Sequence, residues 1–417
     1  MLQLLAALSV CPWFGPGTLE QAPPGVRVRS GYELTIAADN VQGARFLEID
    51  DKGRVFVSRP YAPLKEGERR SNQGDIVCLS EPDAAGVFQK RSEYLTGPVQ
   101  LHGLCWQAPG EGDTKVGGGS GWLWYSTTGS IRKARDTAGD GKADELVTVI
   151  ADGKIPTGGG HWWRSIVVTG DTLYTGIGES QNASDETGTE RQKIWAFDLD
   201  GSNKRAFCGG IRNTEKLRLR PGTTELWGMD HGSDNFGKRF GEGEKGQPIT
   251  DYNPPEEINH YEAGKFYGHP FVVGNRVPRY EFMEKDDILE IAARTTVPEL
   301  CMPAHWAGNG FTFLDPKVVE RSAGKPGAMP LDHAGDMIGC YHGSWNRTEP
   351  GGYCVVRILW DKEEGRPIGY VKLVDGLSKD KKPLIRPVDA VQCTDGSVLF
   401  SCDMTGRIYR IRYVGTK

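Results

Sequence analysis

The sequence predicts an all-β fold, a six-bladed β-propeller, on the basis of three observations. First, the 417 residues include 56 glycines and 25 prolines, and both residue types interrupt long helices. Second, one unit returns six times: an apolar stretch, a tight Asp/Gly turn and an alternating strand rich in aromatic and β-branched residues. Third, a further strand of similar kind follows these units. Six units allow roughly 70 residues each, more than the propeller repeats of about 40 to 50, which leaves room for long loops.

The repeated units are expected to be antiparallel hairpins, because glycine-containing turns join their alternating strands. Four clear copies span residues 48–59, 167–179, 219–232 and 390–403, and two looser copies lie at 122–127 and 309–315. The strands that follow lie at 74–80, 129–136, 193–202, 353–361 and 406–413. Only residues 281–294 show some helical periodicity. A pair of β-sandwiches is the alternative fold, but it does not explain why the same hairpin returns.

We assign residues 1–30 to an N-terminal extension or signal remnant and residues 31–417 to one propeller domain, since no linker stands out. Met1 to Val10 is an apolar run about as long as a signal-peptide core, but no Lys or Arg precedes it. An edge strand or a truncated terminus explains this run better. Sequons at Asn182 and Asn346 favour export only slightly, because such triplets arise often by chance. The location we expect is extracellular or periplasmic.

Composition excludes several classes of protein. The formal net charge of -5 argues against a nucleic-acid partner, and no window approaches eighteen uninterrupted apolar residues, so we expect no membrane span. The nine cysteines form no CxxC pair and no cluster at zinc spacing, and there is no CxxCH motif for a c-type haem. Cys340 and Cys354 are candidates for a disulfide within a hairpin, although pairing cannot be deduced from one sequence.

Candidate site residues lie in the loops, because the inner strands of a propeller converge on a central channel and residues at strand ends meet there. The histidines and arginines of these loops, with their neighbours, are Arg59, His102, His161, Arg164, Arg212, Asn213, His231, His342, Trp345, Asn346, Arg347 and Arg386. Several cations around one channel predict a multiply anionic ligand, because guanidinium groups bind carboxylates bidentately. The channel is therefore expected to be locally basic.

Four segments resemble a known family. They are GGIRNTEKLRLRPGTTELWGMDHGSDN, EEINHYEAGKFYGHP, GCYHGSWNRTEPGGYCVVRI and RPVDAVQCTDGSVLF, in this order. They are similar to segments of the soluble quinoprotein glucose/sorbosone dehydrogenases, and the HGSWNR run is most similar to the branch that contains pyranose dehydrogenases. The resemblance runs from about residue 40 to residue 413. It implies a six-bladed propeller that holds pyrroloquinoline quinone (PQQ) and Ca²⁺ and oxidises a pyranose or related sugar at the anomeric carbon, giving a lactone.

The resemblance also implies the catalytic roles. His161 matches the family's general base, which takes the proton of the sugar hydroxyl while hydride passes to PQQ. Arg212 and Asn213 match an Arg-Asn pair beside the quinone carbonyls, where a fixed cation stabilises developing charge. A histidine satisfied by neighbouring backbone, and an arginine that bridges blades, are the structural alternatives.

The same resemblance assigns cofactor contacts. Arg386 matches an arginine that binds a PQQ carboxylate, and His342 falls where the bacterial glucose enzymes carry a lysine. Arg59, Arg164, His231 and Trp345 lie in or beside matched motifs and are assigned to the cofactor site with them. Trp306 and Trp345 are candidates for the floor of a sugar site, with blade core as the alternative.

The implied Ca²⁺ is held largely by backbone carbonyls, which the matched positions place at Gly232 and Ser233, where the family motif has proline at the second position. A second calcium signal, residues 136–145, has Asp136, Asp140 and Asp144 at EF-type positions but lacks two oxygen ligands. An Asx-rich turn explains that segment better.

Three functions remain open: a PQQ-dependent sugar dehydrogenase that passes electrons to an external acceptor, such as a cytochrome or a quinone; a calcium-dependent sugar lactonase; and a propeller that only binds a protein or a glycan. A lactonase requires carboxylate and amide ligands at the channel centre, for which Glu256, Glu257 and Asn259 are the candidates. In the first family these three residues look structural.

Overall fold

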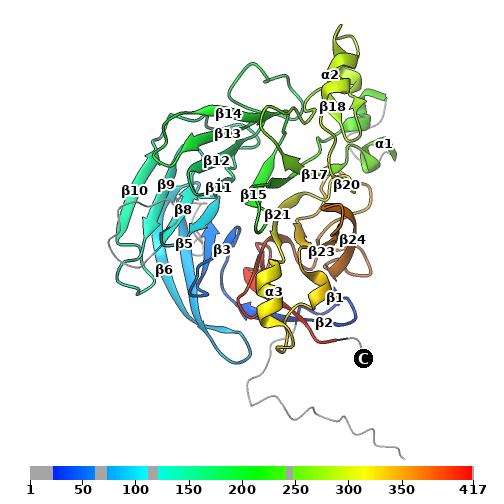
Figure 1. Cartoon of the computed structure of the whole chain (residues 1–417). Coiled ribbons are helices and arrows are strands. Elements are labelled where there is room, and N and C mark those ends of the chain that lie inside the picture. Colours follow the sequence, from blue (N-terminus) through cyan, green and yellow to red (C-terminus); the bar gives the residue numbers. More distant parts are fainter. Residues whose placement is uncertain (1–21, 62–72, 111–120, 241–247, 416–417) are drawn as a thin grey trace, which may run out of the picture.

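The computed structural model describes residues 22–61, 73–110, 121–240 and 248–415. Six antiparallel sheets are arranged around a central axis, each with four strands of the propeller repeat, so the prediction of a six-bladed β-propeller is confirmed (Figure 1). In each blade the first strand lies next to the axis and the fourth lies outermost. Within the described residues, none of the helices has both the length and the apolar character that a membrane crossing requires.

The blades follow one another along the chain, and the sixth is completed by an N-terminal strand. The first three blades are β3 (Leu47–Ile49), β4 (Val55–Arg59), β5 (Gln73–Pro82) and β6 (Phe88–Val99); β7 (Leu104–Gln107), β8 (Trp122–Ser126), β9 (Ile131–Arg135) and β10 (Glu145–Ile150); and β11 (Ile166–Val168), β12 (Thr172–Ile177), β13 (Lys193–Asp198) and β14 (Arg205–Gly209). The last three are β15 (Thr214–Leu219), β16 (Leu226–Asp230), β17 (Glu256–Tyr261) and β20 (Leu300–Met302); β21 (Gly308–Phe313), β22 (Met337–Tyr341), β23 (Cys354–Asp361) and β24 (Arg366–Asp375); and β25 (Pro387–Gln392), β26 (Val398–Cys402), β27 (Arg407–Tyr413) and β2 (Tyr32–Ala38).

The two ends of the chain meet in the sixth blade. β2 pairs antiparallel with β27 from Tyr32 opposite Tyr413 to Ala38 opposite Ile408, which closes the ring of blades. β1 (Arg27–Val28) pairs with β24 as a fifth strand of the fifth blade. Residues 22–30, which we assigned to an N-terminal extension, therefore contribute one strand to a blade, whereas residues 1–21 lie outside the described part.

Helices occur in the connections between strands. They are η1 (Phe236–Phe240), α1 (Pro248–Tyr252), η2 (Tyr280–Phe282), α2 (Ile288–Arg294), α3 (Pro316–Ser322) and η3 (Leu331–His333), and the fourth blade also carries the small hairpin β18 (Val272–Val273) and β19 (Val277–Pro278). The helical periodicity of residues 281–294 corresponds to the end of η2 and to all of α2. α3 was not predicted; it begins after Asp315, which caps it by accepting from the backbone N–H of Lys317 at 2.8 Å.

One unit of the repeat and one candidate disulfide differ from the prediction. Residues 122–127 are the second strand of their blade, and the inner strand β7 was not predicted, because Leu104–Gln107 is short and shows no alternation. Cys340 and Cys354 do not form the hairpin disulfide: in the register of β22 and β23, Cys340 faces Val355 and Cys354 faces Tyr341. Both thiols are free, as are the other six described cysteines, and Cys11 lies outside the described residues.

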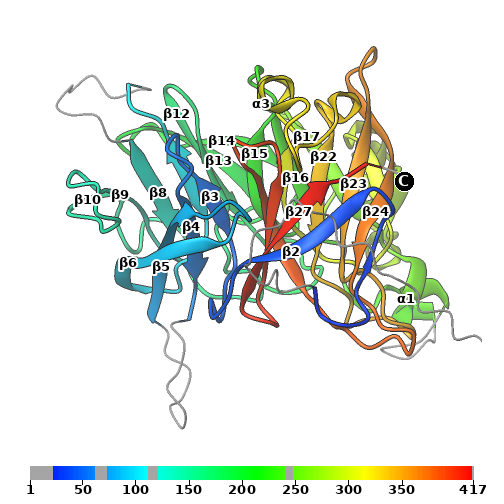
Figure 2. The ribbon, with the colours of Figure 1, turned by 90° about the horizontal axis from the view of Figure 1, so that it is seen from below.

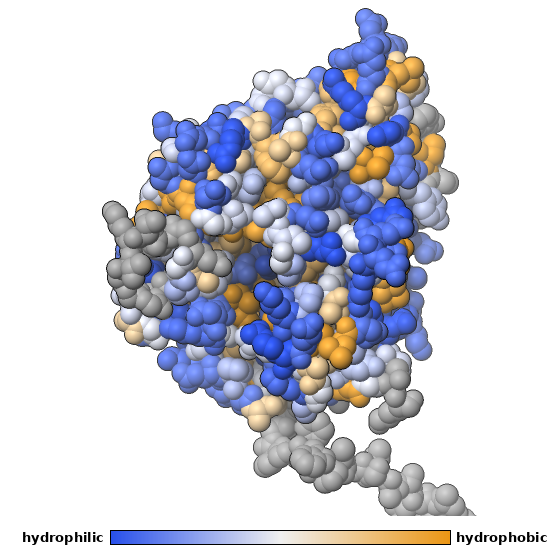
Figure 3. Space-filling view, viewed as in Figure 1, coloured by the Kyte–Doolittle hydropathy of each residue, from blue (hydrophilic) through white to orange (hydrophobic). Residues whose placement is uncertain are grey.

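Apolar side chains fill the space between blades, whereas charged side chains fill part of the axis. Lys216 on β15 lies 3.1 Å from Asp389 on β25 and 3.6 Å from Glu48 on β3, and all three residues are buried. Arg218 also pairs with Glu48, at 3.3 Å. Figure 3 shows the face that carries α3, with a hollow near its centre where hydrophilic residues lie. Figure 2 shows the propeller from the side, with α3 toward one face and α1 toward the opposite face.

Candidate functional site

The predicted site residues gather on the face opposite α3, which we call the site face. It is built from the residues just before each inner strand and just after each second strand. Arg45, His102, Arg164 and Arg212 each lie two residues before an inner strand, and Asn213 and Arg386 lie one residue before. His231, His342 and Asp403 come immediately after second strands. Because every blade repeats the same strand order, these positions meet around one end of the channel.

His161 lies in the loop between β10 and β11 and is half-buried. Its Nδ1 lies 3.0 Å from the backbone oxygen of Glu179, and because a carbonyl only accepts, Nδ1 carries the hydrogen. No described residue hydrogen-bonds to Nε2. Burial, with Arg212 and His231 nearby, lowers the pKa of His161 to about 3. The side chain therefore holds an available lone pair on Nε2 at neutral pH, as a general base requires.

Arg212 is buried and held by several acceptors at once. Its guanidinium donates to the backbone oxygen of Asn182 at 2.9 Å, to Oδ1 of Asn182 at 2.9 Å and to the backbone oxygen of Gly232 at 3.0 Å. The ion pair with Asp234 is longer, at 3.4 Å. These contacts fix the guanidinium on the site face. The backbone of Glu179 links the two predicted catalytic residues, because its oxygen accepts from Nδ1 of His161 and its N–H donates to the backbone oxygen of Arg212 at 2.9 Å.

Asn213 and His231 form a directed pair. Nδ2 of Asn213 lies 3.1 Å from Nδ1 of His231, and Nε2 of His231 lies 3.0 Å from the backbone oxygen of Gly308. The amide donates to Nδ1, so the ring hydrogen is on Nε2 and points toward the carbonyl. His231 thereby joins the fourth blade to the fifth.

Asp403 contacts basic side chains of the fifth and sixth blades. Arg386 donates to its Oδ1 at 2.7 Å, and Nε2 of His342 lies 3.0 Å from its Oδ2. Burial lowers the pKa of His342, although the contact with Asp403 opposes this shift. Arg386 stays 41% exposed at its side chain, and no described residue bonds to its two terminal nitrogens. Arg386 thus combines an exposed guanidinium with terminal donors that no described residue uses.

Sequence reasoning missed Arg45 and the two tryptophans after His161. Arg45 bridges Glu215 and Asp403, and its guanidinium lies 4.7 Å from the ring centroid of Trp163. Trp162 and Trp163 stack with centroids 3.7 Å apart and are both half-buried. The recurrence of a polar residue two positions before an inner strand is the signal that identifies Arg45.

The mouth of the channel is less basic than predicted, because three of its arginines each have a carboxylate beside them. Arg45 contacts Glu215, Arg386 contacts Asp403 and Arg212 contacts Asp234. The prediction counted only the cations. Acidic residues at matching positions, such as Asp403 after β26, were not considered.

Three predicted cofactor residues lie apart from this cluster or have other partners. Arg59 is buried at the end of β4 and forms an ion pair with Asp75 of the same blade. Arg164 is buried and donates to the backbone oxygens of His161 at 3.2 Å and Trp163 at 3.0 Å, and also to that of Pro156, so it shapes the loop that carries His161. Trp345 is 59% exposed. Their assignment to the cofactor stays a prediction.

One of the two predicted calcium ligands has a partner within the chain. The backbone oxygen of Gly232 accepts from Arg212. Buried Ser233 accepts from Arg279 through its hydroxyl, whereas the predicted ligand is its backbone carbonyl. A calcium ion at Gly232 would lie beside a guanidinium, and like charges repel. Among the described residues, no three His, Cys, Asp or Glu side chains are grouped so as to hold a metal ion.

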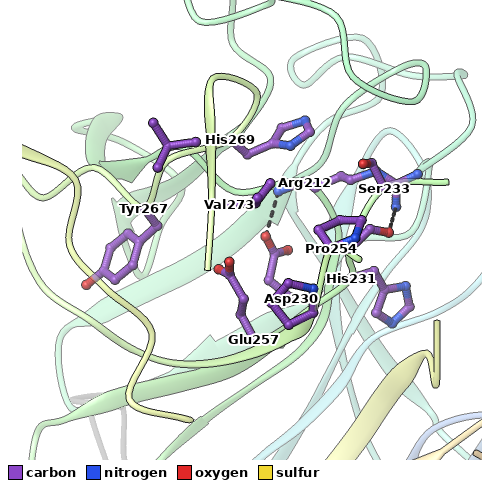
Figure 4. A pocket seen from close by; sticks show the side chains of 12 residues that line it. Arg212, Asp230, His231, Ser233, Pro254, Glu257, Tyr267, His269 and Val273 are labelled. Atoms are coloured by element: carbon purple, nitrogen blue, oxygen red, sulfur yellow. Dashed lines mark hydrogen bonds between the residues drawn. The ribbon is translucent and has the colours of Figure 1, made fainter. Parts of the chain in front are cut away.

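A small cavity lies behind this segment (Figure 4). Its volume is about 20 Å³, enough for one water molecule, and its lining includes Arg212, Asp230, His231, Ser233, Glu257 and His269. His269 donates from Nε2 to Glu179 at 2.6 Å on the His161 side. The cavity thus touches the elements that hold both predicted catalytic residues.

The other sequence signals have partners within the fold. In the 136–145 loop, Asp136 accepts from the backbone N–H groups of Gly139 and Gly141 at 2.6 and 2.9 Å and pairs with Arg54, which is the expected Asx-rich turn. Glu256, Glu257 and Asn259 lie on β17, the third strand of the fourth blade, away from the axis. Asn346 is buried and exchanges hydrogen bonds with Asn235 at 2.7 and 2.8 Å, so the asparagine of this sequon is inaccessible in the folded protein.

Comparisons with known proteins agree with this architecture. One curated relative, an uncharacterized protein of Borreliella burgdorferi, is 28% identical over 225 residues, which is 53% of this chain and 52% of the relative, so the match spans about half of that protein. The Trichoderma reesei protein of carbohydrate-active enzyme family AA12 superposes with a TM-score of 0.73 at 16% identity, over 95% of this chain and 100% of the other. The holo PQQ domain of pyranose dehydrogenase from Coprinopsis cinerea gives a TM-score of 0.70 at 17% identity, over 96% of this chain and 99% of the other. A family model described as TrAA12-like matches residues 26–414, and the chain belongs to this family.

Proposed function

We propose that the protein is a sugar oxidoreductase that uses PQQ, with His161 as the base that accepts the proton of the sugar hydroxyl. One observation carries the proposal: His161 is neutral, its Nδ1 hydrogen is directed to Glu179, and its Nε2 lone pair stays available beside the fixed cation Arg212. Family membership and the likeness to a pyranose dehydrogenase domain support the class of reaction.

The chain offers features that suit a flat, polycarboxylate cofactor. Arg386 has terminal donors that no described residue uses, which suits a carboxylate. Trp162 stacks on Trp163 with one ring face, and no other described ring stacks on it. Nε of Arg45 is buried without a hydrogen-bond partner in the structure, and Arg45 and His102 both lie against Trp163. Bound PQQ would supply the hydride acceptor.

The residues of the chain would divide the remaining work. His161 receives the proton on Nε2, and the Glu179 carbonyl holds the ring in the required tautomer. Arg212 presents a fixed positive charge where negative charge develops, at no cost of reorganisation because Asn182 and Gly232 already hold it. Calcium at Gly232 and Ser233 stays a prediction that this set of contacts does not favour. An external electron acceptor is part of the proposal.

The experiment compares three proteins: the wild type, His161→Ala and His260→Ala. Each is loaded with PQQ, and dye reduction is followed with a panel of aldoses. We expect His161→Ala to bind PQQ but to lose about 10²- to 10⁴-fold in turnover, the usual contribution of a general base. His260 lies on β17, stacked on Trp227 with centroids 5.1 Å apart, and serves as the control for loss of an imidazole. Turnover of His161→Ala at the wild-type rate would contradict the assignment of His161 as the base. A wild type that does not bind PQQ would contradict the assignment of PQQ as the cofactor.

A further inference from the structure

Two aromatic side chains of the site face are exposed to solvent. Trp345, in the connection between β22 and β23, is 59% exposed, and Tyr252, the last residue of α1, is 72% exposed. Both connections follow second strands, and α1 lies toward the face opposite α3 (Figure 2). Of the tryptophans that the structure describes, only Trp345 is exposed. Exposed apolar side chains that gather on one part of a surface are typical of a binding site.

Trp345 is exposed although the loop on either side of it is fixed. Its neighbours Ser344 and Asn346 are buried. The backbone N–H of Ser344 donates to the backbone oxygen of Gly351 at 2.9 Å, and its own backbone oxygen accepts from the hydroxyl of Tyr353 at 2.9 Å. Because these contacts hold the backbone on both sides, the folded loop itself presents the indole ring to solvent.

Tyr252 is joined to the same loop. The guanidinium of Arg347 lies 5.7 Å from the centroid of the Tyr252 ring and donates to the backbone oxygen of Asp251. The backbone N–H of Thr348 donates to Oδ1 of Asp251 at 2.9 Å. Arg347 follows Trp345 by two residues, so the two aromatic side chains belong to one part of the surface. We call Tyr252 and Trp345 together the aromatic rim.

The aromatic rim is linked to the proposed catalytic residues through a short series of contacts. Asn346, next to Trp345, exchanges hydrogen bonds with Asn235 at 2.7 and 2.8 Å. Asp234, next to Asn235, forms the ion pair with Arg212 at 3.4 Å. A molecule that reacts beside Arg212 and extends out of the channel on this side therefore meets the aromatic rim.

The reacting group of the proposed substrate limits where further sugar units can be attached. The anomeric hydroxyl is the group that is oxidised, so it faces His161 and carries no further unit. Any further unit is linked through another hydroxyl and extends away from His161, toward the channel mouth. A pyranose ring has apolar C–H faces and a polar edge, and an aromatic face beside polar groups matches both. Thr348 and Glu349, both exposed, provide polar groups beside Trp345.

The size of the aromatic rim favours a saccharide over a protein partner. A Trp or a Tyr side chain buries about 150–250 Å² when it is fully covered, so the two rings together offer at most roughly 500 Å². A stable protein interface buries about 800 Å² on each partner. One or two sugar rings cover a surface of the smaller size.

We propose that Tyr252 and Trp345 bind the second sugar unit of an oligosaccharide, so that the substrate class is the reducing end of an oligosaccharide. That this unit belongs to a substrate rests on the proposed function. Binding of an oligosaccharide at the aromatic rim is a property of the fold and is measurable without cofactor or turnover.

The test uses the full chain without cofactor and measures dissociation constants by saturation-transfer NMR titration. The probes are the mono-, di- and trisaccharides of the cello-, malto- and xylo-oligosaccharide series. In at least one series we expect the disaccharide to bind at least about threefold tighter than the monosaccharide. Trp345→Ala and Tyr252→Ala should each weaken disaccharide binding about three- to tenfold, the factor that corresponds to loss of one aromatic contact.

Two further variants separate stacking from other effects. Tyr252→Phe keeps the ring and removes only the hydroxyl, so its disaccharide affinity should match the wild type within about twofold. Tyr280→Ala is the matched control, because Tyr280 is a 48% exposed tyrosine of η2 in the fourth blade, outside the aromatic rim, and its loss should leave disaccharide binding unchanged. Thermal unfolding checks that each variant is folded.

Specific results would overturn the proposal. Equal affinity for mono- and disaccharides in all three series would do so, and so would wild-type disaccharide affinity in both Trp345→Ala and Tyr252→Ala. Trp345 is also a predicted cofactor residue, so PQQ binding is measured separately. If Trp345→Ala binds PQQ more weakly but the disaccharide like the wild type, Trp345 belongs to the cofactor and its part in the aromatic rim is wrong.

A second readout connects the aromatic rim to turnover. In the loaded enzyme, the ratio of kcat/KM for the disaccharide to kcat/KM for the monosaccharide should fall about three- to tenfold in Tyr252→Ala, through a higher KM for the disaccharide. If the wild type binds the disaccharide but shows no turnover with PQQ, the proposed function fails while the aromatic rim stands. If the wild type oxidises monosaccharides but neither binds nor prefers longer saccharides, the inference fails while the proposed function stands.

Discussion

Arg45 donates from Nη2 to Oε2 of Glu215 at 2.7 Å, and this contact joins the first and fourth blades across the channel mouth. The same guanidinium reaches Oδ2 of Asp403 at 3.4 Å. Both carboxylates are nearly enclosed, with side chains 6% and 11% exposed. The site face thus rests on a buried ion network rather than on isolated cations, and its stability depends on the balance of charge within that network.

Removing Arg45 should therefore be costly. Arg45→Ala leaves two buried carboxylates without their shared cation, and we expect a loss of about 3–5 kcal/mol in the free energy of unfolding. Urea denaturation followed by tryptophan fluorescence measures this. Arg27→Ala is the control: Arg27 pairs with Asp375 at 2.6 Å but is 61% exposed, so its loss should cost less than about 1 kcal/mol. A comparable cost for the two variants would mean that the network does not depend on Arg45.

The activity of the loaded enzyme should show no acid limb from His161 between pH 5 and 8. In the free protein, the pKa of His161 is lowered to about 3, mainly by burial, so the ring stays neutral over that range. The pH dependence of kcat/KM reports groups of the free enzyme, so the loss from His161 protonation should begin only as the pH falls toward 3. A kcat/KM profile with an acid limb near pH 6.5 that disappears in His161→Gln would contradict this.

Trp306 and Trp345, the two candidates for the floor of a sugar site, should differ in how much their loss lowers stability. Trp306 is only 8% exposed and packs edge-on against Tyr341 with centroids 5.6 Å apart, so Trp306→Ala should cost about 3–5 kcal/mol of stability. Trp345 is 59% exposed, so Trp345→Ala should leave stability within about 0.5 kcal/mol of the wild type. Thermal unfolding distinguishes them, and a rise in KM for a sugar in the second variant alone would place Trp345 at the substrate.

The repeat could be predicted from the sequence because the period of alternating strands and glycine turns is a local signal. All six units contain strands of the observed blades, and the helical signal at 281–294 matches η2 and α2 in part. β7 was missed because an inner strand of four residues, such as Leu104–Gln107, is too short to show a period. The closing strand β2 pairs with residues that follow it by 370 positions (Ala38 and Ile408) to 381 positions (Tyr32 and Tyr413), which no local pattern indicates.

The site could be predicted only where a residue type itself suggests chemistry. His161, Arg212 and Asn213 were identified because loop histidines and arginines, with their neighbours, are candidate site residues in a propeller. The structure brings these three residues together. Tyr252 was not identified, because its place beside the Trp345 loop depends on contacts between residues that lie 96 and 97 positions apart. Arg59 was assigned by its neighbourhood in the sequence, but its partner is Asp75 within its own blade.

Thiol chemistry should be slow in the folded protein. The eight described cysteines are free, and burial raises the pKa of Cys301, the one that is only half-buried, to about 11. The thiolate is the reactive form, so a thiol reagent at pH 7 should react with these groups on unfolding rather than before it. A Cys11→Ser variant removes the cysteine outside the described residues. Fast reaction of this variant in native buffer, or a shift of its melting temperature on adding reductant, would contradict the assignment of free, buried thiols.

The closure of the propeller by β2 should be sensitive to acid through His333, which lies where β2 meets the fifth blade. Nε2 of His333 is contacted by the hydroxyl of Tyr32 on β2 and by Nη1 of Arg357 at 2.8 Å, and its Nδ1 lies 2.9 Å from Asp332. Two donors on Nε2 require a neutral ring with its hydrogen on Nδ1. Burial and the charge of Arg357 lower the pKa of His333 accordingly. Because the pKa is lower in the folded than in the unfolded state, the unfolded state binds more protons below about pH 6.5, and stability falls as the pH falls.

We expect the urea midpoint to drop between pH 7.5 and pH 5 by more in the wild type than in His333→Asn, which does not titrate there. Tyr32→Phe is the matched control, because it removes one donor without changing the titration, so it should lower the midpoint at pH 7.5 but keep a pH dependence close to that of the wild type. An equal pH dependence in the wild type and His333→Asn would assign the acid sensitivity to the other buried histidines instead.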